Sequence, residues 1–185
     1  MPQHNTNTYS IIARVLHWLT VLLLILLFTS GIAMTERTEQ YNLWDATTNT
    51  LYSSHKALGL FLLTMIVLRL IYRLSFGTPP HPLSLNNLQK IAAEGVHWGL
   101  YALLILVPMV GWIGISMFPA LNIFGVQIPA LVAPDRQGAA WAFEIHEVLG
   151  YLLLALIALH IAAALFHAFI LKDDILQRMW PGKSE

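Results

Sequence analysis

Four long apolar segments constrain the fold of this 185-residue chain more than any other feature. They cover about residues 11–34, 51–74, 91–117 and 144–171, and each approaches the roughly 20 residues that a helix needs to cross a bilayer core. Hydrophobic residues make up 57% of the chain and charged residues 11%, whereas a soluble domain has about a quarter charged residues. The sequence therefore predicts an all-α integral membrane four-helix bundle, formed by a single domain over residues 1–185.

The segments between the four spans differ in length. Three prolines, at 79, 80 and 82, separate the second span from the third. The longer connection, residues 118–143, contains an apolar stretch at 120–132 and predicts a loop or lid on the membrane face, with a disordered loop as the alternative. The first span resembles a signal peptide but is too long and lacks an A-x-A site, so we expect it to be retained.

Basic residues predict the orientation, because lysine and arginine accumulate on the cytoplasmic side. One side holds Arg14, Arg69, Arg73, Lys90, Lys172, Arg178 and Lys183, and the other holds Arg37, Lys56 and Arg136. We therefore expect both termini in the cytoplasm and the loop between the third and fourth spans in the periplasm. Lys56 and Arg69 fall within the second span, where they can snorkel to the surface or meet acidic groups of a bound ligand.

Charge and cysteine content exclude several classes of function. The formal net charge is zero, which argues against nucleic acid as a partner because that partner requires a basic face. The chain has no cysteine, which excludes disulfides, iron–sulfur clusters and covalently attached c-type haem. Imidazole is the remaining strong metal ligand within the spans.

At least five of the eight histidines fall inside predicted spans, where an ionisable residue usually binds something. His55 and His146 lie near the outer ends of the second and fourth spans, and His17 and His160 lie in the inner halves of the first and fourth. His146 and His160 are 14 residues apart, which places them on nearly the same helix face, about 21 Å apart along the axis. The sequence thus predicts two histidine pairs, one in each leaflet.

Two histidine pairs at different depths fit haem iron better than zinc. Zinc takes three or four ligands at one centre, whereas a haem iron takes two axial imidazoles from facing helices and its porphyrin occupies an apolar cleft. Two filled axial positions leave no open site for oxygen chemistry at iron. We therefore expect two b-type haems that transfer electrons.

A short repeat supports the outer pair. Residues 55–63 can be aligned with residues 146–154, and each copy has a histidine followed by glycine four residues later, Gly59 and Gly150. These glycines would lie below the rings and leave room for a macrocycle; the alternative is that they only let helices pack closely. Lys56 follows the first histidine and is expected to pair with Glu147 or to bind a haem propionate.

The complete pattern resembles the bacterial cytochrome b561 family. The resemblance rests on His17-Trp18-Leu19, His55-Lys56-x-x-Gly59, His146-x-x-Leu149-Gly150-Tyr151, His160-x-x-Ala163-Ala164-Leu165-x-His167 and Arg178-Met179, in this order over nearly the whole chain. It implies a four-helix, di-haem protein of the bacterial inner membrane. It also implies that His17 and His160 ligate the inner haem iron and that His55 and His146 ligate the outer one, as their depths predict.

Two further histidines are candidates for a quinone site. His97 lies in the inner half of the third span, and His167 follows His160 by seven residues. They are expected to donate hydrogen bonds or protons to a quinone near the inner haem. The alternatives are that they only pair with neighbouring helices and that His167 replaces His160 as the inner ligand.

The resemblance implies an oxidoreductase that exchanges electrons with the ubiquinone pool. One member of the family is a superoxide oxidase, so the expected donor on the periplasmic side is superoxide, a small anion that Lys56 and Arg136 could attract. The first alternative is a haem-bearing anchor that relays electrons between quinone and a partner dehydrogenase. The second is a non-redox four-helix membrane protein, such as a transporter or an assembly factor.

Overall fold

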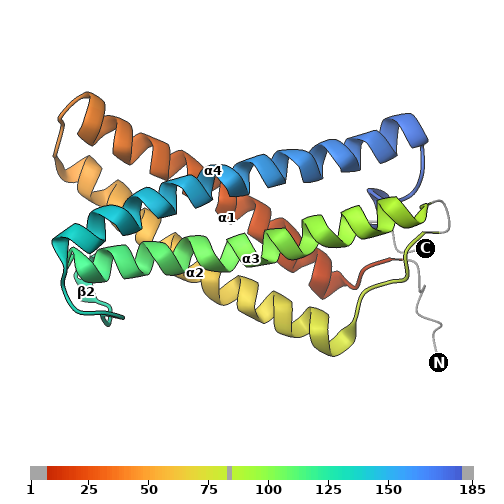
Figure 1. Cartoon of the computed structure of the whole chain (residues 1–185), viewed down its shortest axis with the longest axis horizontal. Helices are drawn as coiled ribbons and strands as arrows, with labels where there is room; N and C mark the ends of the chain where they lie inside the picture. The colour runs from red at the N-terminus through yellow and green to blue at the C-terminus, as the bar shows by residue number, and fades with distance from the viewer. Residues whose placement is uncertain (1–7, 83–84, 181–185) are drawn as a thin grey trace.

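The computed structural model describes residues 8–82 and 85–180. Its main elements are four long helices, α1 (Ile11–Thr35), α2 (Ala46–Phe76), α3 (Asn87–Met117) and α4 (Arg136–Phe166) (Figure 1). Short helical turns follow α1 at Glu36–Gln40 and follow α4 at His167–Leu171 and Gln177–Met179.

Each long helix begins at a polar residue whose side chain accepts a hydrogen bond from a backbone N–H of the first turn. The four residues are Ser10, Asp45, Asn86 and Asp135, and Asn86 forms a reciprocal capping box with Gln89. Such side chains satisfy donors that have no partner within the helix. They fix where each helix starts in an otherwise apolar sequence.

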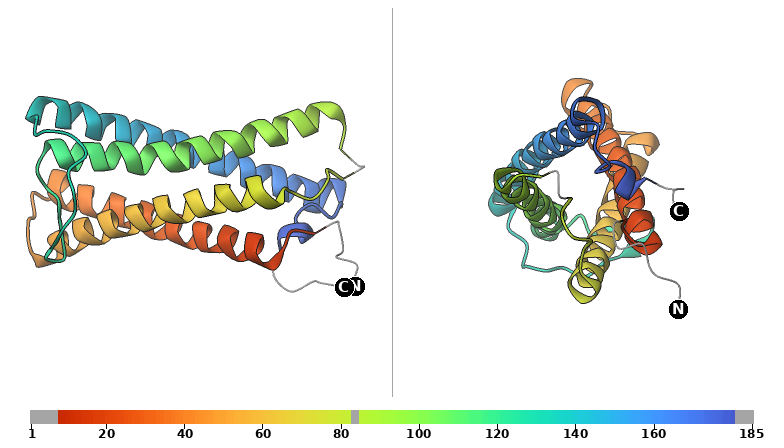
Figure 2. Two further views of the ribbon diagram at one scale, coloured as in Figure 1. Left: turned by 90° about the horizontal axis from the view of Figure 1, so that it is seen from below. Right: turned by 90° about the vertical axis from the view of Figure 1, so that its right-hand side faces the viewer.

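The helices form a bundle in which α1 packs mainly on α2 and α3 mainly on α4. The start of α1 and the end of α4 lie at one end of the bundle, here called the inner end, and the α3–α4 loop lies at the other, the outer end (Figure 2). Buried leucine and isoleucine side chains from all four helices meet in the core, including Leu23, Leu62, Leu104 and Leu153.

The outward faces of the bundle are apolar too. All four long helices are long and apolar enough to cross a membrane, and large hydrophobic side chains such as Leu22, Phe61 and Leu152 are about half exposed. Apolar side chains that cover the outside as well as the core suit a surface that faces lipid. The predicted four-helix membrane protein is confirmed.

The helices extend beyond some of the predicted spans. α2 begins at Ala46 instead of about residue 51, and α4 begins at Arg136 instead of about residue 144. The sequence prediction followed hydrophobicity, whereas capped polar turns continue a helix outside the hydrocarbon. Helix α3 continues through Pro108. Lys183, which entered the prediction of orientation, lies outside the described residues.

The α3–α4 loop contains a small β-hairpin, β1 (Asn122–Ile123) and β2 (Val126–Gln127). Phe124 and Gly125 form the two-residue turn with φ of 50° and 87°, the left-handed values of a type I′ hairpin. The loop crosses the outer end toward α2 (Figure 2), where Lys56 Nζ donates to the carbonyls of Ala120 and Asn122. The predicted loop is therefore attached to the bundle by a lysine of α2.

Candidate haem sites

The outer histidine pair joins α2 to α4. The ring centres of His55 and His146 are 6.1 Å apart, and the ring planes are nearly perpendicular at 81°. His55 Nδ1 lies 3.2 Å from the Leu27 carbonyl and 3.2 Å from Ser30 Oγ, both on α1. His146 Nδ1 lies 2.8 Å from the Val107 carbonyl on α3.

These hydrogen bonds determine the tautomer of the two outer imidazole rings, that is, which ring nitrogen carries the proton. A carbonyl oxygen only accepts, so Nδ1 of each ring is the donor, and in the neutral imidazole Nε2 then has the free lone pair. Metal-binding histidines commonly have their second nitrogen fixed in this way. The outer pair is thus prepared to ligate a metal through Nε2.

Two glycines other than Gly59 and Gly150 lie against the outer rings. A Cβ added to Gly31 of α1 would lie 3.3 Å from His55 Cε1, and one added to Gly111 of α3 would lie 3.0 Å from Nδ1 of His146. Contacts this short are tighter than ordinary van der Waals distances. Each ring therefore occupies space that a glycine on a neighbouring helix leaves open, and the only signal in the sequence was a glycine inside an apolar span.

The inner end contains three histidines from three helices. The ring centres of His17 (α1) and His160 (α4) are 6.3 Å apart, and the ring centre of His97 (α3) lies 5.4 Å from that of His160. His17 Nδ1 accepts a 3.1 Å hydrogen bond from Arg69 Nη2 of α2. The inner pair therefore has the spacing of the outer pair but a different partner at Nδ1.

Basic and aromatic side chains surround this inner cluster. The guanidinium groups of Arg69 and Arg73 lie over the Tyr101 ring, 5.5 and 5.7 Å from its centre, and Arg73 also lies over Trp98. Glu94 is 3.3 Å from Arg73. Such cation–π contacts help to hold charge within a low-dielectric region.

The spacing of both pairs fits the axial ligands of a haem. A metal–imidazole bond of roughly 2 Å on each side, plus roughly 1 Å from each nitrogen to its ring centre, places two axial rings about 6 Å apart. The observed distances are 6.1 and 6.3 Å. Across residues 8–82 and 85–180, no cluster of three or more His, Cys, Asp or Glu side chains could hold a bare metal ion. Two imidazoles suit a metal that brings its other ligands with it, as haem iron does.

The remaining predicted site residues lie as follows. A Cβ on Gly150 would meet nothing within 4 Å, and one on Gly59 would meet only the Leu27 side chain at 4.0 Å, so neither glycine touches a histidine ring. Lys56 binds the loop carbonyls described above instead of Glu147. His167 Nδ1 lies 2.6 Å from Asp173 Oδ2.

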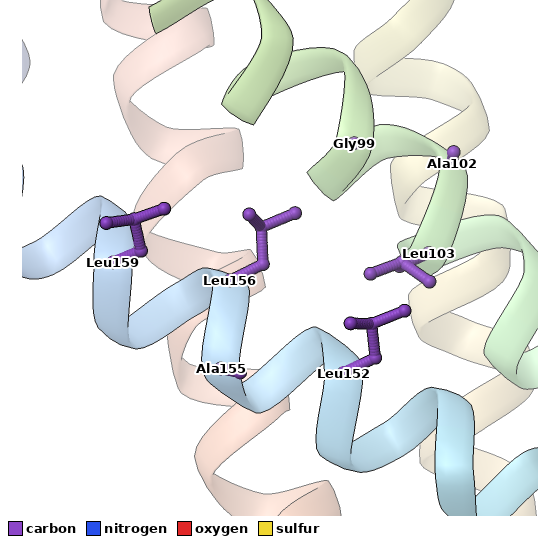
Figure 3. Close-up of a pocket in the computed structure, with 7 residues that line it drawn as sticks. All are labelled: Gly99, Ala102, Leu103, Leu152, Ala155, Leu156 and Leu159. Atoms are coloured by element: carbon purple, nitrogen blue, oxygen red, sulfur yellow. The ribbon is translucent and has the colours of Figure 1, made fainter. Parts of the chain in front are cut away.

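A groove between α3 and α4 lies beside the inner cluster. Its volume is about 430 Å³, and apolar side chains of both helices face each other across it (Figure 3). The lining residues are Gly99, Ala102, Leu103, Leu152, Ala155, Leu156 and Leu159. Two of the lining residues are close to the inner histidines in the sequence: Leu159 directly precedes His160, and Gly99 follows His97 by two residues.

Four membrane-spanning helices with partly buried, facing histidine pairs define a membrane protein of the cytochrome b class. The comparisons agree: the family model described as prokaryotic cytochrome b561 matches residues 8–182. The chain belongs to this family, whose members are haem-binding electron-transport proteins of the membrane.

Two of the named relatives match this chain over nearly its whole length, and a third matches about two thirds of it. The chain is 32% identical to cytochrome b561 homolog 2 of Escherichia coli K12, over 97% of this chain and 95% of that protein. It is 27% identical to the probable superoxide oxidase CybB of Yersinia pestis, over 95% and 97%. Cytochrome b562 of Cereibacter sphaeroides is 30% identical over 68% of this chain and 65% of its own length.

Proposed function

We propose that the protein is a di-haem cytochrome b that passes electrons from superoxide at the periplasmic face to ubiquinone. The observation that carries this proposal is the presence of two histidine pairs, His55–His146 and His17–His160, with ring centres 6.1 and 6.3 Å apart. Each haem would supply one-electron redox chemistry. A relative named as a probable superoxide oxidase, matched over almost the whole chain, supports superoxide as the donor.

The common helix α4 supports transfer between the two sites. His146 and His160 are 14 residues apart on it, about 21 Å along the axis, and the porphyrins themselves would span part of that distance. Two superoxide ions each lose one electron and leave as O₂, and one ubiquinone gains two electrons and two protons. The chain contributes ligands, spacing and electrostatics to this reaction.

Lys56 is the cation that follows an outer ligand directly. Arg37 is neutralised by Asp45 at 2.7 Å, whereas Lys56 is bound to uncharged carbonyls of the loop. A positive charge close to His55 would raise the local concentration of a small anion. This contact supports the outer end as the entry for superoxide.

His97 is the best candidate for contact with the quinone head group. Its ring is next to that of His160, and the groove in Figure 3 provides an apolar surface for the isoprenoid tail. Glu94 lies one helical turn before His97 and contacts both Arg73 and His81. We assign this side to the cytoplasm and the protein to the inner membrane, because the basic residues concentrate at the inner end.

Stopped-flow mixing of the purified protein with superoxide tests the proposal. Superoxide should reduce the haems rapidly, and a short-chain ubiquinone should then reoxidise them. Lys56→Gln should slow the first step at low ionic strength, and His97→Gln should slow only the second. Failure of superoxide to reduce haems that ubiquinol can reduce would contradict the proposal.

The alternative, a haem-bearing anchor for a dehydrogenase, has one structural feature in its favour. Phe124 and Val126 at the tip of the hairpin are 61% and 66% exposed, and an apolar tip at the outer end could contact a partner protein. In this case the purified chain would be inactive toward superoxide. The same stopped-flow experiment therefore separates the two functions.

A further inference from the structure

Arg69 is an intramembrane cation whose contacts do not balance its charge. It lies half-buried on α2, where Nη2 donates to His17 Nδ1 at 3.1 Å and the guanidinium lies over Tyr101. Among the ion pairs found in residues 8–82 and 85–180, none joins Arg69 to a carboxylate. Arg73, one turn later on the same helix, has Glu94 at 3.3 Å.

The hydrogen bond from Arg69 leaves His17 in the wrong tautomer for ligation through Nε2. A guanidinium only donates, so Nδ1 of His17 must accept, and the proton of the neutral ring then lies on Nε2. The outer histidines have the opposite arrangement, because their Nδ1 atoms face carbonyl oxygens. To ligate iron through Nε2, His17 must therefore move its proton to Nδ1, where Arg69 already presents a donor.

We propose that Arg69 is a carboxylate-binding residue for the inner haem: its guanidinium exchanges His17 Nδ1 for a propionate of the bound haem. This inference rests on the proposed His17–His160 haem site. The exchange involves no net gain or loss of protons, since His17 only changes tautomer. It gives Arg69 the anion that it lacks and frees Nε2 of His17.

Carboxylate is the ligand chemistry that these contacts favour. The planar fork of a guanidinium matches the two oxygens of a carboxylate, and Arg69 Cζ lies over the Tyr101 ring, 5.5 Å from its centre. An uncompensated charge within a membrane is costly, so an anion should bind strongly here. Haem b has two propionates, and either of them could supply the carboxylate that pairs with Arg69.

A haem whose propionates are esterified tests this role directly. The full-length apoprotein is titrated with haem b and with its dimethyl ester, with binding followed by the Soret band, in a His146→Ala background that retains only the inner site. We expect the ester to bind about 10- to 100-fold more weakly than haem b. With Arg69→Met added, the two should bind with equal affinity.

Two controls separate this role from a structural one. Arg73→Met removes a guanidinium over the same Tyr101 ring but should preserve the preference for haem b over its ester. In a His17→Ala background, which retains only the outer site, Arg69→Met should leave haem affinity unchanged and thereby report that the variant folds. Arg69→Lys should retain part of the preference.

Three results would overturn the inference. The first is equal binding of haem b and its ester by the chain with Arg69 intact. The second is an Arg69→Met variant that binds both more weakly by the same factor, because Arg69 would then only shape the site. The third is a His146→Ala protein that binds no haem, because the inner site would then be absent. Haem content of the unmodified protein is measured first, and fewer than two haems there would contradict the proposed di-haem function.

Discussion

The outer and inner histidine pairs have nearly the same spacing but different surroundings. At the outer pair, carbonyls of α1 and α3 accept from the ring Nδ1 atoms, and the rings occupy space that glycines of the same two helices leave open. At the inner pair, an arginine occupies Nδ1 of His17 and a third histidine lies beside His160. The outer rings therefore already present Nε2 for a metal, whereas ligation through Nε2 of His17 would require its hydrogen bond with Arg69 to change, as proposed above.

Removal of a ligand should have the largest effect and tests the division into two sites. His146→Ala should lose the outer haem and His17→Ala the inner haem, so each variant should retain about half of the haem, because one imidazole alone cannot complete a bis-imidazole site. The pyridine haemochrome assay measures this per polypeptide. His167→Ala is the control and should retain both haems, since His167 contacts Asp173. Full haem content in His146→Ala would refute the assignment.

The glycines behind the outer rings should have an intermediate effect. Gly111→Ala would place a Cβ 3.0 Å from the His146 ring and Gly31→Ala one 3.3 Å from the His55 ring, so the histidines must shift to make room. We expect both variants to bind the outer haem more weakly. The larger loss should occur in Gly111→Ala, whose affinity for that haem should fall roughly tenfold, the equivalent of about 1.4 kcal/mol. Redox titration of haem absorbance would resolve the affected haem.

Gly95→Ala is the matched control, because a Cβ there meets nothing within 4 Å. Gly150→Ala is informative for the same reason. A loss of haem in Gly150→Ala would support the predicted clearance for a macrocycle, and unchanged haem content would assign that glycine to the lipid face or to helix packing. An unaffected outer haem in Gly111→Ala would contradict the proposed fit of ring against glycine.

The smallest effect concerns the cap of α2 at the outer end. The backbone N–H of Thr48 and the Arg37 guanidinium hold the pKa of Asp45 below its usual value. A carboxyl whose pKa is lowered by folding stabilises the folded state at pH values above its pKa in the unfolded chain, about 3.9. This stabilisation is lost as the pH falls through the pKa of the folded state. Asp45→Asn should therefore lower the thermal midpoint slightly at pH 7 and by less at pH 3, as scanning calorimetry in detergent would measure. Equal differences at both pH values would contradict this charge effect.

The sequence predicted the fold well because hydrophobicity and helix length are local properties. Four spans, and the depths of His17, His55, His146 and His160, follow from residue order and helical rise alone. The limits of α2 and α4 did not, because the caps Asp45 and Asp135 lie outside the apolar segments. The hairpin at 122–127 was also missed, since it depends on positive φ at Phe124 and Gly125.

The sequence by itself thus determined the class of protein and which imidazoles share a depth. Only the tertiary structure decided what each imidazole touches, because partners such as Leu27, Val107 and Arg69 come from other helices, 28, 39 and 52 residues away. The same holds for Lys56, which donates to the loop carbonyls of Ala120 and Asn122 and not to Glu147. Sequence periodicity specifies which residues share one face of a helix. The rotation and packing of the helices specify which face of a neighbouring helix those residues contact.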